Sequence, residues 1–139
     1  MIILDTNVLS ELMKREPGAV VVDWVESKVA ASLFTTTITQ AEILYGIQLL
    51  PSGKRRKEIG AAAREMFYSD FPGRVLPFDE DAAESYTQIA ASRRQIGHPI
   101  SQFDAQIAAI ALSRDGAVAT RNTADFEECG IDLINPWQA

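Results

Sequence analysis

The chain opens with the residues 1-MIILDTN-7, an apolar run that ends in three polar residues. The run Met1 to Leu4 is suited to a buried strand, and Asp5 with the two polar residues after it can cap the amphipathic segment Val8 to Lys14. We therefore expect a buried strand that leads directly into a helix. This order places Asp5 at the carboxyl end of the first strand, where open α/β sheets commonly bind their ligands.

The same alternation of short apolar runs and amphipathic segments continues to the end of the chain. Further strands are expected at Ser32 to Thr37, Arg74 to Phe78, Ala117 to Thr120 and Ile131 to Ile134. Further helices are expected at Ala19 to Val29, Thr39 to Leu50, Lys54 to Tyr68, Asp79 to Ile96, Ser101 to Arg114 and Thr123 to Glu128. This pattern predicts an α/β fold, with a mainly parallel five-stranded sheet flanked by helices on both faces.

Composition and length favour a single globular domain that spans residues 1–139. Hydrophobic residues make up 47% and charged residues 23% of the chain, which is usual for globular proteins. The apolar stretches are far shorter than the roughly 20 residues that cross a membrane. The N-terminus also lacks the basic region of a signal peptide, so we expect a cytoplasmic protein. The single cysteine, Cys129, is expected to be a packing residue.

The overall charge argues against a protein that coats nucleic acid. The formal net charge is -6 and the sequence pI is about 4.7. This objection weakens if the acids are gathered in a pocket that holds cations, because a bound metal reverses the field that a phosphate meets. Adjacent basic residues include the run Lys54, Arg55, Arg56 and Lys57, and also the pair Arg93 and Arg94. Each group is either a solvated helix face or a contact for RNA.

Four acidic residues are expected near the carboxyl ends of the strands. Asp5 follows the first strand, and Glu42 and Asp125 lie in the first turns of the helices after the second and fourth strands. Asp104 lies in the opening turn of the helix that leads into the fourth strand. Because the carboxyl ends of parallel strands share one edge of a sheet, these acids from distant parts of the chain can converge there.

A cluster of carboxylates favours magnesium chemistry. Mg²⁺ prefers oxygen ligands and is usually held by one or two carboxylates, with water and substrate phosphate in the other positions. Two such ions about 4 Å apart activate water and neutralise the leaving oxygen in many nucleases. Hydrolysis of a phosphodiester then needs no histidine. His98, the only histidine, is expected to be a surface or packing residue, with a substrate contact as the alternative.

Each acid also has a structural interpretation when it is taken alone. Asp5 is a suitable helix cap, and Asp104 is placed to form a capping box with Ser101. Asp125 would favour the dipole of its helix, and Glu42 would suit a solvated helix surface. Position alone does not separate these roles from catalysis.

Several stretches together resemble the PIN domain, and specifically the VapC-type toxin ribonucleases of the FitB-like branch. They are IILDTNVLSEL, TITQAEILYGI, LPFDEDAAESYTQI, FDAQIAAIAL and VATRNTADFEECGIDLINPW, in this order along the chain. The resemblance implies a PIN-like fold, an endoribonuclease that depends on Mg²⁺ or Mn²⁺, and a homodimer. It also implies an antitoxin partner that occludes the acidic pocket, with operator DNA contacted only through the antitoxin.

The resemblance also implies roles for individual residues. Asp5, Glu42 and Asp104 match the catalytic, metal-binding acids of the family. The position of the fourth acid differs among members of the family. Some use an aspartate that matches Asp125, whereas others carry an aspartate where this chain has Asn122. The amide of Asn122 cannot supply charge. Four polar residues are expected to lie next to the acids and to hold them in place without being the principal metal ligands: Thr6, Asn7, Thr120 and Asn122.

Two other functions are alternatives to a ribonuclease. A phosphoacceptor receiver domain would need an acidic neighbour beside Asp5 and a lysine after the fifth strand, and no lysine occurs after Lys57. A PIN fold that binds RNA or protein without cutting is the second alternative. The aromatic residues Tyr45, Phe67 and Tyr68 are expected in the core, with RNA stacking as their other possible role. The RNA that is cut does not follow from the sequence.

Overall fold

The computed structural model describes residues 1–139 and consists of five strands and six α-helices. The strands are β1 (Ile2–Leu4), β2 (Leu33–Thr36), β3 (Val75–Leu76), β4 (Ala117–Ala119) and β5 (Leu133–Ile134). The helices are α1 (Thr6–Leu12), α2 (Ala19–Glu26), α3 (Thr37–Gln48), α4 (Lys54–Glu65), α5 (Glu80–Gln95) and α6 (Gln102–Ser113). Short helical turns are η1 (Ala30–Ser32), η2 (Met66–Asp70), η3 (Thr123–Phe126) and η4 (Pro136–Gln138).

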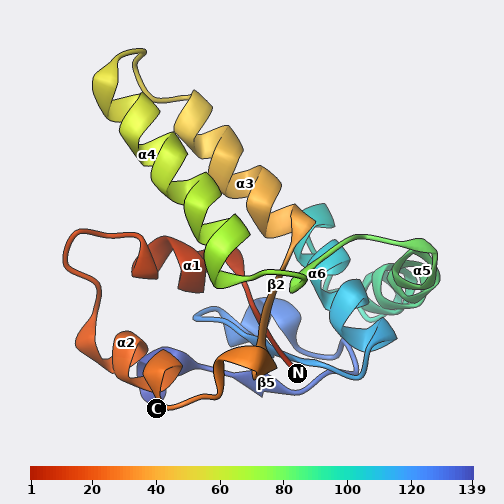
Figure 1. Ribbon diagram of the computed structural model, residues 1–139. Coiled ribbons are helices and arrows are strands. Elements are labelled where there is room, and N and C mark those ends of the chain that lie inside the picture. Colours follow the sequence, from red (N-terminus) through yellow and green to blue (C-terminus); the bar gives the residue numbers. More distant parts are fainter.

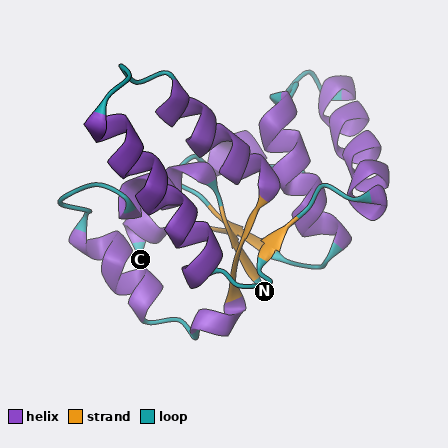
Figure 2. Ribbon diagram, turned by 45° about the horizontal axis from the view of Figure 1, so that its top comes forward, coloured by secondary structure: helices purple, strands orange, loops and turns teal.

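The five strands form one parallel sheet in the order β3-β2-β1-β4-β5. Figure 2 shows this sheet in the middle of the molecule, surrounded by helices. The expected α/β fold is therefore confirmed. The chain builds outward from β1 to β3 on one side and then returns to place β4 on the other side of β1. Such a reversal of strand order opens a crevice at the carboxyl ends of the two strands.

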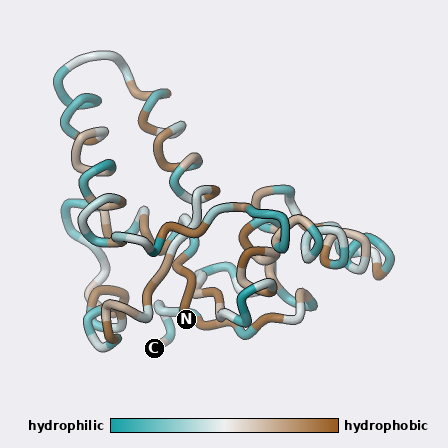
Figure 3. The backbone as a smooth tube through the Cα atoms, turned by 45° about the vertical axis from the view of Figure 1, so that its right-hand side comes forward, coloured by the Kyte–Doolittle hydropathy of each residue, from teal (hydrophilic) through white to brown (hydrophobic).

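The sheet has a separate apolar core on each of its faces. Because neighbouring residues of a strand point to opposite faces, Ile3 and Val118 pack with α5 and α6, whereas Leu4 and Ala119 pack with the helices α1 to α4. Figure 1 shows α5 and α6 together on one side of the sheet. In Figure 3 the most apolar part of the chain follows the central strands. Burial on both faces explains why the strands are almost continuously apolar.

The hairpin of α3 and α4 projects from the body of the protein (Figure 1). Its tip is the turn between Gln48 and Lys54, in which Gly53 has a φ of 147° that favours glycine. The basic run that begins at Lys54 therefore lies at the free end of the hairpin. At 1.5 Å per residue, the end of α3 is about 9 Å further along the helix axis than Glu42.

Three local expectations differ from the structure. The N-cap of α3 is Thr36, whose hydroxyl accepts a hydrogen bond from the amide of Thr39, so the helix begins earlier than Thr39. Val29, expected on a helix, lies beyond α2 and is 75% exposed. The helix expected at Thr123 to Glu128 is only the short turn η3. Glu127 is extended and the φ of Glu128 is positive, which ends any helix there.

None of the helices is long and apolar enough to cross a membrane.

Candidate active site

Four acidic residues lie around the crevice between β1 and β4. Asp5 directly follows β1, and Asp125 lies in η3 shortly after β4. Glu42 is in the second turn of α3, which follows β2, and Asp104 is in the first turn of α6. The carboxyl end of α6 leads into β4, so its amino end lies at the same edge of the sheet as Asp5.

Asp5 is a buried carboxylate that caps a helix. It is the N-cap of α1, since its Oδ1 accepts a 3.1 Å hydrogen bond from the amide of Val8. Only 4% of the residue is exposed, and this burial raises the pKa of Asp5 from 3.8 to about 6. The negative charge of Asp104 adds to the rise, while the hydroxyl of Thr120 and the amide of Val8 oppose it. The capping interpretation is confirmed, and it does not exclude a role in the site.

Asp104 is the acid that links the other three. Burial is the main cause that raises its pKa, and the charge of Asp125 raises it further. The charge of Asp104 in turn raises the pKa values of Asp5 and Glu42. The hydroxyl of Ser101 accepts a 3.2 Å hydrogen bond from the amide of Asp104 and so caps α6. The hydroxyl of Ser101 also interacts with the carboxylate of Asp104, and this interaction opposes the rise in the pKa of Asp104.

Glu42 is oriented by threonine hydroxyls behind it. The hydroxyl of Thr6 donates a 2.8 Å hydrogen bond to Oε1 of Glu42, and the hydroxyls of Thr6 and Thr39 lie 3.0 Å apart. Burial nevertheless leaves the pKa of Glu42 raised, with the Thr6 hydrogen bond opposing the shift. Thr6 therefore supports an acid, as expected from the sequence. Thr39, which was expected only as the first residue of α3, is fully buried.

Thr120 lies beside Asp5 because of the register of the two strands. Leu4 is paired with Ala119, so the next residues of β1 and β4 emerge together. Thr120 is fully buried, and its hydroxyl also accepts a 3.1 Å hydrogen bond from the amide of Asn122. Asn122 itself is exposed, and Asn7 contributes its backbone amide to Asp5 rather than its exposed side chain.

The acids offer suitable donors for a hard divalent cation. Their oxygens are the ligands that Mg²⁺ prefers, and mutual repulsion among them is a charge distribution that a cation relieves. However, no three Asp, Glu, His or Cys side chains stand close enough to enclose one ion. Asp5 faces the amide of Val8 and Glu42 faces Thr6, so each carboxylate has a partner of its own. One or two carboxylates suffice for Mg²⁺, and the donor set therefore fits it.

The basic residues divide into exposed and buried groups. Lys54, Arg55, Lys57 and Arg94 are exposed, and Arg56 is half-buried. Arg93, expected as a possible RNA contact, is only 6% exposed, and its guanidinium is bound to carbonyl groups of the protein. The expectation for Arg93 is therefore wrong, because this side chain faces inward from α5. His98 is exposed, and its carbonyl accepts a hydrogen bond from Arg93.

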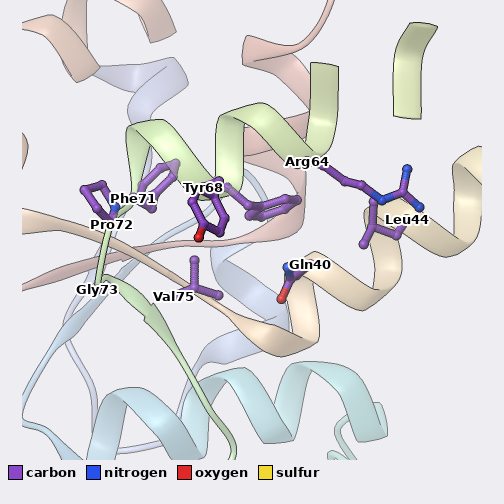
Figure 4. Close-up of a pocket in the computed structure, with 9 residues that line it drawn as sticks. Gln40, Leu44, Arg64, Tyr68, Phe71, Pro72, Gly73 and Val75 are labelled. Atoms are coloured by element: carbon purple, nitrogen blue, oxygen red, sulfur yellow. The ribbon is translucent and has the colours of Figure 1, made fainter. Parts of the chain in front are cut away.

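The largest cavity lies away from the acids. It has a volume of about 640 Å³ and is lined by residues of α3, α4, η2 and the segment from η2 into β3, among them Gln40, Leu44 and Phe71 (Figure 4). Gln40 and Glu42 are two residues apart, which turns their side chains by about 200° around the helix axis. A second hollow, of about 580 Å³, borders the acidic site and is lined by Ala41, Glu42, Tyr45 and Phe103. The acids, rather than the largest cavity, mark the chemistry.

Two aromatic residues differ from the expectation that they belong to the core. Phe67 is buried, but Tyr45 is 66% and Tyr68 is 85% exposed. Tyr45 lies on the side of α3 that carries Glu42, and Tyr68 lies on η2 at the edge of the largest cavity. Periodicity misplaced them because neighbouring apolar residues of each helix already fill the core.

Sequence reasoning missed the inward position of Arg93. The helical spacing of the sequence could have indicated that Arg93 is buried, because the other buried residues of α5 are Ala82 and Ile89. These positions are seven and four residues apart and share one face of a helix. The adjacency of Arg93 and Arg94 favoured a solvated pair instead, although neighbours in a helix point about 100° apart.

Comparisons with known proteins agree with this architecture. The sequence profile of the PIN domain matches residues 2–131. A protein of Sinorhizobium fredii named VapC ribonuclease Y4jK is 42% identical over 99% of each chain. Toxin FitB of Neisseria gonorrhoeae is 37% identical over 99% of each chain. The crystal structure of FitAcB from Neisseria gonorrhoeae has a TM-score of 0.93 at 37% identity, with 100% of both chains covered. The similarity therefore includes every segment that carries an acid of the site.

Proposed function

The chain belongs to the PIN-domain family, and from this premise we propose that it is a divalent-metal-dependent endoribonuclease, the toxin of a toxin–antitoxin pair. The observation that carries the proposal is the central position of Asp104. Its charge acts on Asp5 and Glu42, and the charge of Asp125 acts on it, at one edge of a parallel sheet. Relatives named VapC ribonuclease and Toxin FitB support the same class of activity.

Purified protein, freed of any inhibitor, tests the proposal most directly. We expect internal cleavage of RNA when Mg²⁺ or Mn²⁺ is present and none when EDTA is in excess. Sequencing the new RNA ends after brief expression would identify the substrate. Cleavage that survives chelation would contradict the metal-dependent mechanism.

The mechanism assigns distinct tasks to the acids. We assign the carboxylates of Asp5 and Asp104 to hold the cation, with Asp125 completing the charge of the site. When bound there, a cation would supply a lower pKa for an attacking water and positive charge against the phosphate. Asp5 is fixed as a helix cap, so its carboxylate is positioned before substrate arrives. Such preorganisation costs no rearrangement during the reaction.

Glu42 is suited to accept a proton. The hydroxyl of Thr6 occupies Oε1, which leaves the other carboxylate oxygen, Oε2, to receive a proton from water. Burial raises the pKa of Glu42, and a carboxylate whose pKa is closer to neutrality is a better general base at cellular pH. Phosphodiester hydrolysis in this site therefore needs no histidine or cysteine nucleophile.

RNA is proposed to approach along the α3–α4 hairpin. The exposed basic residues at the start of α4 lie at the tip of this hairpin and offer charges for the phosphate backbone. Contacts of this kind position a strand without reading its sequence. The net charge of -6 argues against binding to nucleic acid by the protein as a whole. Basic residues gathered at one tip can still attract phosphates locally.

An antitoxin is the proposed regulatory partner. A cluster of carboxylates is a target for a cationic side chain, since charge-assisted hydrogen bonds to carboxylates are strong. We expect the protein to be toxic on expression and to purify with a small partner that covers the acids. Glu42→Gln should weaken this complex. An unchanged affinity would mean that the partner inhibits from another surface.

A second copy of the chain is proposed to cover the apolar surface beside the site. Tyr45 of α3 is 66% exposed, and Leu49, which directly follows the end of α3, is 67% exposed. Phe103 of α6 is 54% exposed. Tyr45 and Phe103 border the same hollow. A self-complementary patch of this kind suits a two-fold dimer. Light scattering should give twice the mass of 15.3 kDa, and Tyr45→Glu should give the monomer.

The alternative is a PIN fold that binds RNA or protein without cutting. The raised pKa values of Asp5, Glu42 and Asp104 favour the enzyme, because perturbed acids gathered in a crevice are typical of catalytic sites. The cleavage assay with its EDTA control separates the two functions.

A further inference from the structure

Arg93 connects the end of α5 to the segment that carries Asp125. Its Nε donates a 2.6 Å hydrogen bond to the carbonyl of His98. Its Nη1 donates to the carbonyl of Asp125 at 3.0 Å and to the carbonyl of Glu127 at 2.8 Å, and it lies 3.6 Å from Sγ of Cys129. One buried guanidinium therefore bridges two segments that are about thirty residues apart in the sequence.

The segment that Arg93 holds is strained. Glu128 has a φ of 61°, in the left-handed region that residues other than glycine disfavour. Such a conformation persists only where the surroundings hold it in place. The residues on either side, Glu127 and Cys129, are the ones that contact Nη1 of Arg93. The guanidinium therefore stabilises a loop shape that the chain would not adopt by itself.

The charge of Arg93 has no carboxylate bound to it. The ion pairs of the protein join Lys14 to Glu11, Lys54 to Glu58 and Arg114 to Asp79. A buried cation without a bound counter-ion costs stability. Among the acids of the site, Asp104 is the one whose charge offsets that of Arg93, since Arg93 lowers the pKa of Asp104. Arg93 thus offsets part of the repulsion that gathers around Asp104.

We propose that Arg93 is a positioning residue of the acidic site, whose guanidinium fixes the backbone from Asp125 to Cys129 and thereby places the Asp125 carboxylate beside Asp104. This role rests on the proposed function, because it treats both acids as parts of one site. It also explains why an arginine occupies the inward face of α5. A lysine keeps the charge but lacks the planar fork that donates in two directions at once.

Hydrogen exchange on the full chain tests the clamp without any catalytic readout. We compare Arg93→Lys with Arg94→Lys, which changes the exposed neighbour in the same helix. In Arg93→Lys we expect amides between residues 123 and 130 to exchange about tenfold faster, while amides of β1 and α1 keep their wild-type rates. Arg94→Lys should match wild type throughout. Unchanged exchange in residues 123–130, or faster exchange over the whole chain, would overturn the proposal.

Metal binding and kinetics test the consequence for the site. Calorimetric titration with Mn²⁺ should give a Kd for Arg93→Lys about tenfold weaker than wild type, and RNA cleavage should lose about tenfold in kcat with little change in KM. Wild-type Mn²⁺ affinity and kcat in a variant with a loosened loop would overturn the positioning role. If wild type binds Mn²⁺ but cuts no RNA, the proposed function fails, while the exchange and Mn²⁺ measurements still decide the role of Arg93.

Discussion

The hydroxyl of Thr6, at the start of α1, donates a 2.8 Å hydrogen bond to Oε1 of Glu42 on α3. Two helices that each follow a neighbouring strand are therefore joined at the carboxyl edge of the sheet by a hydroxyl and a carboxylate. The bond favours the charged form of Glu42 and opposes the effect of burial on its pKa. It also fixes which oxygen of Glu42 faces the site.

Replacement of Thr6 by valine should therefore impair cleavage more than stability. Valine keeps the shape of threonine but removes the donor, so the carboxylate of Glu42 should lose the orientation in which it accepts a proton. This loss should outweigh any gain in basicity from the higher pKa of Glu42. We expect a fall in kcat of about tenfold and a loss of about 1 kcal/mol in the free energy of unfolding. Thr6→Ser should restore most of the rate. Thr87→Val, on the exposed surface of α5, is the control, and equal rates in Thr6→Val and Thr87→Val would contradict the role.

The stability of the metal-free protein should fall as the pH rises. Burial raises the pKa of Asp5 to about 6, so the folded state holds a proton that the unfolded state releases near pH 4. The stabilising contribution is complete below the unfolded pKa and is lost as the pH passes through the folded pKa. The total is roughly 2 to 3 kcal/mol. Urea unfolding in EDTA between pH 4.5 and 7.5 would measure it, and a flat profile would show that Asp5 is not strained.

Asp5→Asn provides the matched comparison for this pH profile. Asparagine keeps an oxygen to accept the amide of Val8 but does not titrate, so the fall in stability between pH 4.5 and 7.5 should shrink. Asp79→Asn changes the N-cap of α5. It also removes the ion pair with Arg114 at the surface, and it should keep the wild-type profile. A steep profile in Asp5→Asn would assign the effect to other groups.

Much of the fold follows from local pattern because α/β units record their alternation in the sequence. The five segments expected as strands contain the five strands of the sheet, and α5 ends shortly before Gly97, whose φ is 79°. The order of the strands in the sheet does not follow from this local pattern. The position of β4 beside β1, rather than beyond β3, depends on packing between residues more than a hundred positions apart, which periodicity does not contain.

The site was predictable where it depends on strand ends and unpredictable where it depends on side-chain direction. Asp5 was placed by the strand that precedes it, and Thr120 could be placed beside it once β1 and β4 are paired. The bond from Thr6 to Glu42 joins two helices and has no local signature. Arg93 was misassigned because its exposed neighbour Arg94 made the pair resemble a solvated surface.

The basic tip of the α3–α4 hairpin should govern the salt dependence of RNA binding. Lys54 and Arg55 are exposed there, and each phosphate contact to a single strand contributes about 0.7 to the slope of log Kd against log salt. Lys54→Gln combined with Arg55→Gln should lower that slope by about 1.4 and weaken binding without changing the cleavage position. Arg15→Gln combined with Lys28→Gln removes the same charge elsewhere. Equal slopes in the two double variants would exclude the tip as an RNA contact.

The last prediction separates a structural role from a metal-binding role at Asp104. Its backbone amide is capped by the hydroxyl of Ser101, and its carboxylate interacts with the same hydroxyl, an interaction that the side-chain oxygen of asparagine can also make. Burial and the charge of Asp125 both raise the pKa of Asp104, which means that the ionised carboxylate is strained in the metal-free protein. Asp104→Asn removes that charge and should leave the metal-free protein at least as stable as wild type.

The same variant should lose the properties that depend on a cation. In Asp104→Asn the increase in melting temperature that Mn²⁺ gives wild type should largely disappear, and RNA cleavage should fall by more than about a hundredfold. Asp81→Asn, which removes an exposed carboxylate from the first turn of α5, is the matched control and should retain both properties. Thermal melts with and without Mn²⁺, run beside the cleavage assay, measure all three effects. If Asp104→Asn still cuts RNA at a rate near that of Asp81→Asn, Asp104 is not a residue of the site, and the acidic centre must be reassigned around Asp5 and Glu42.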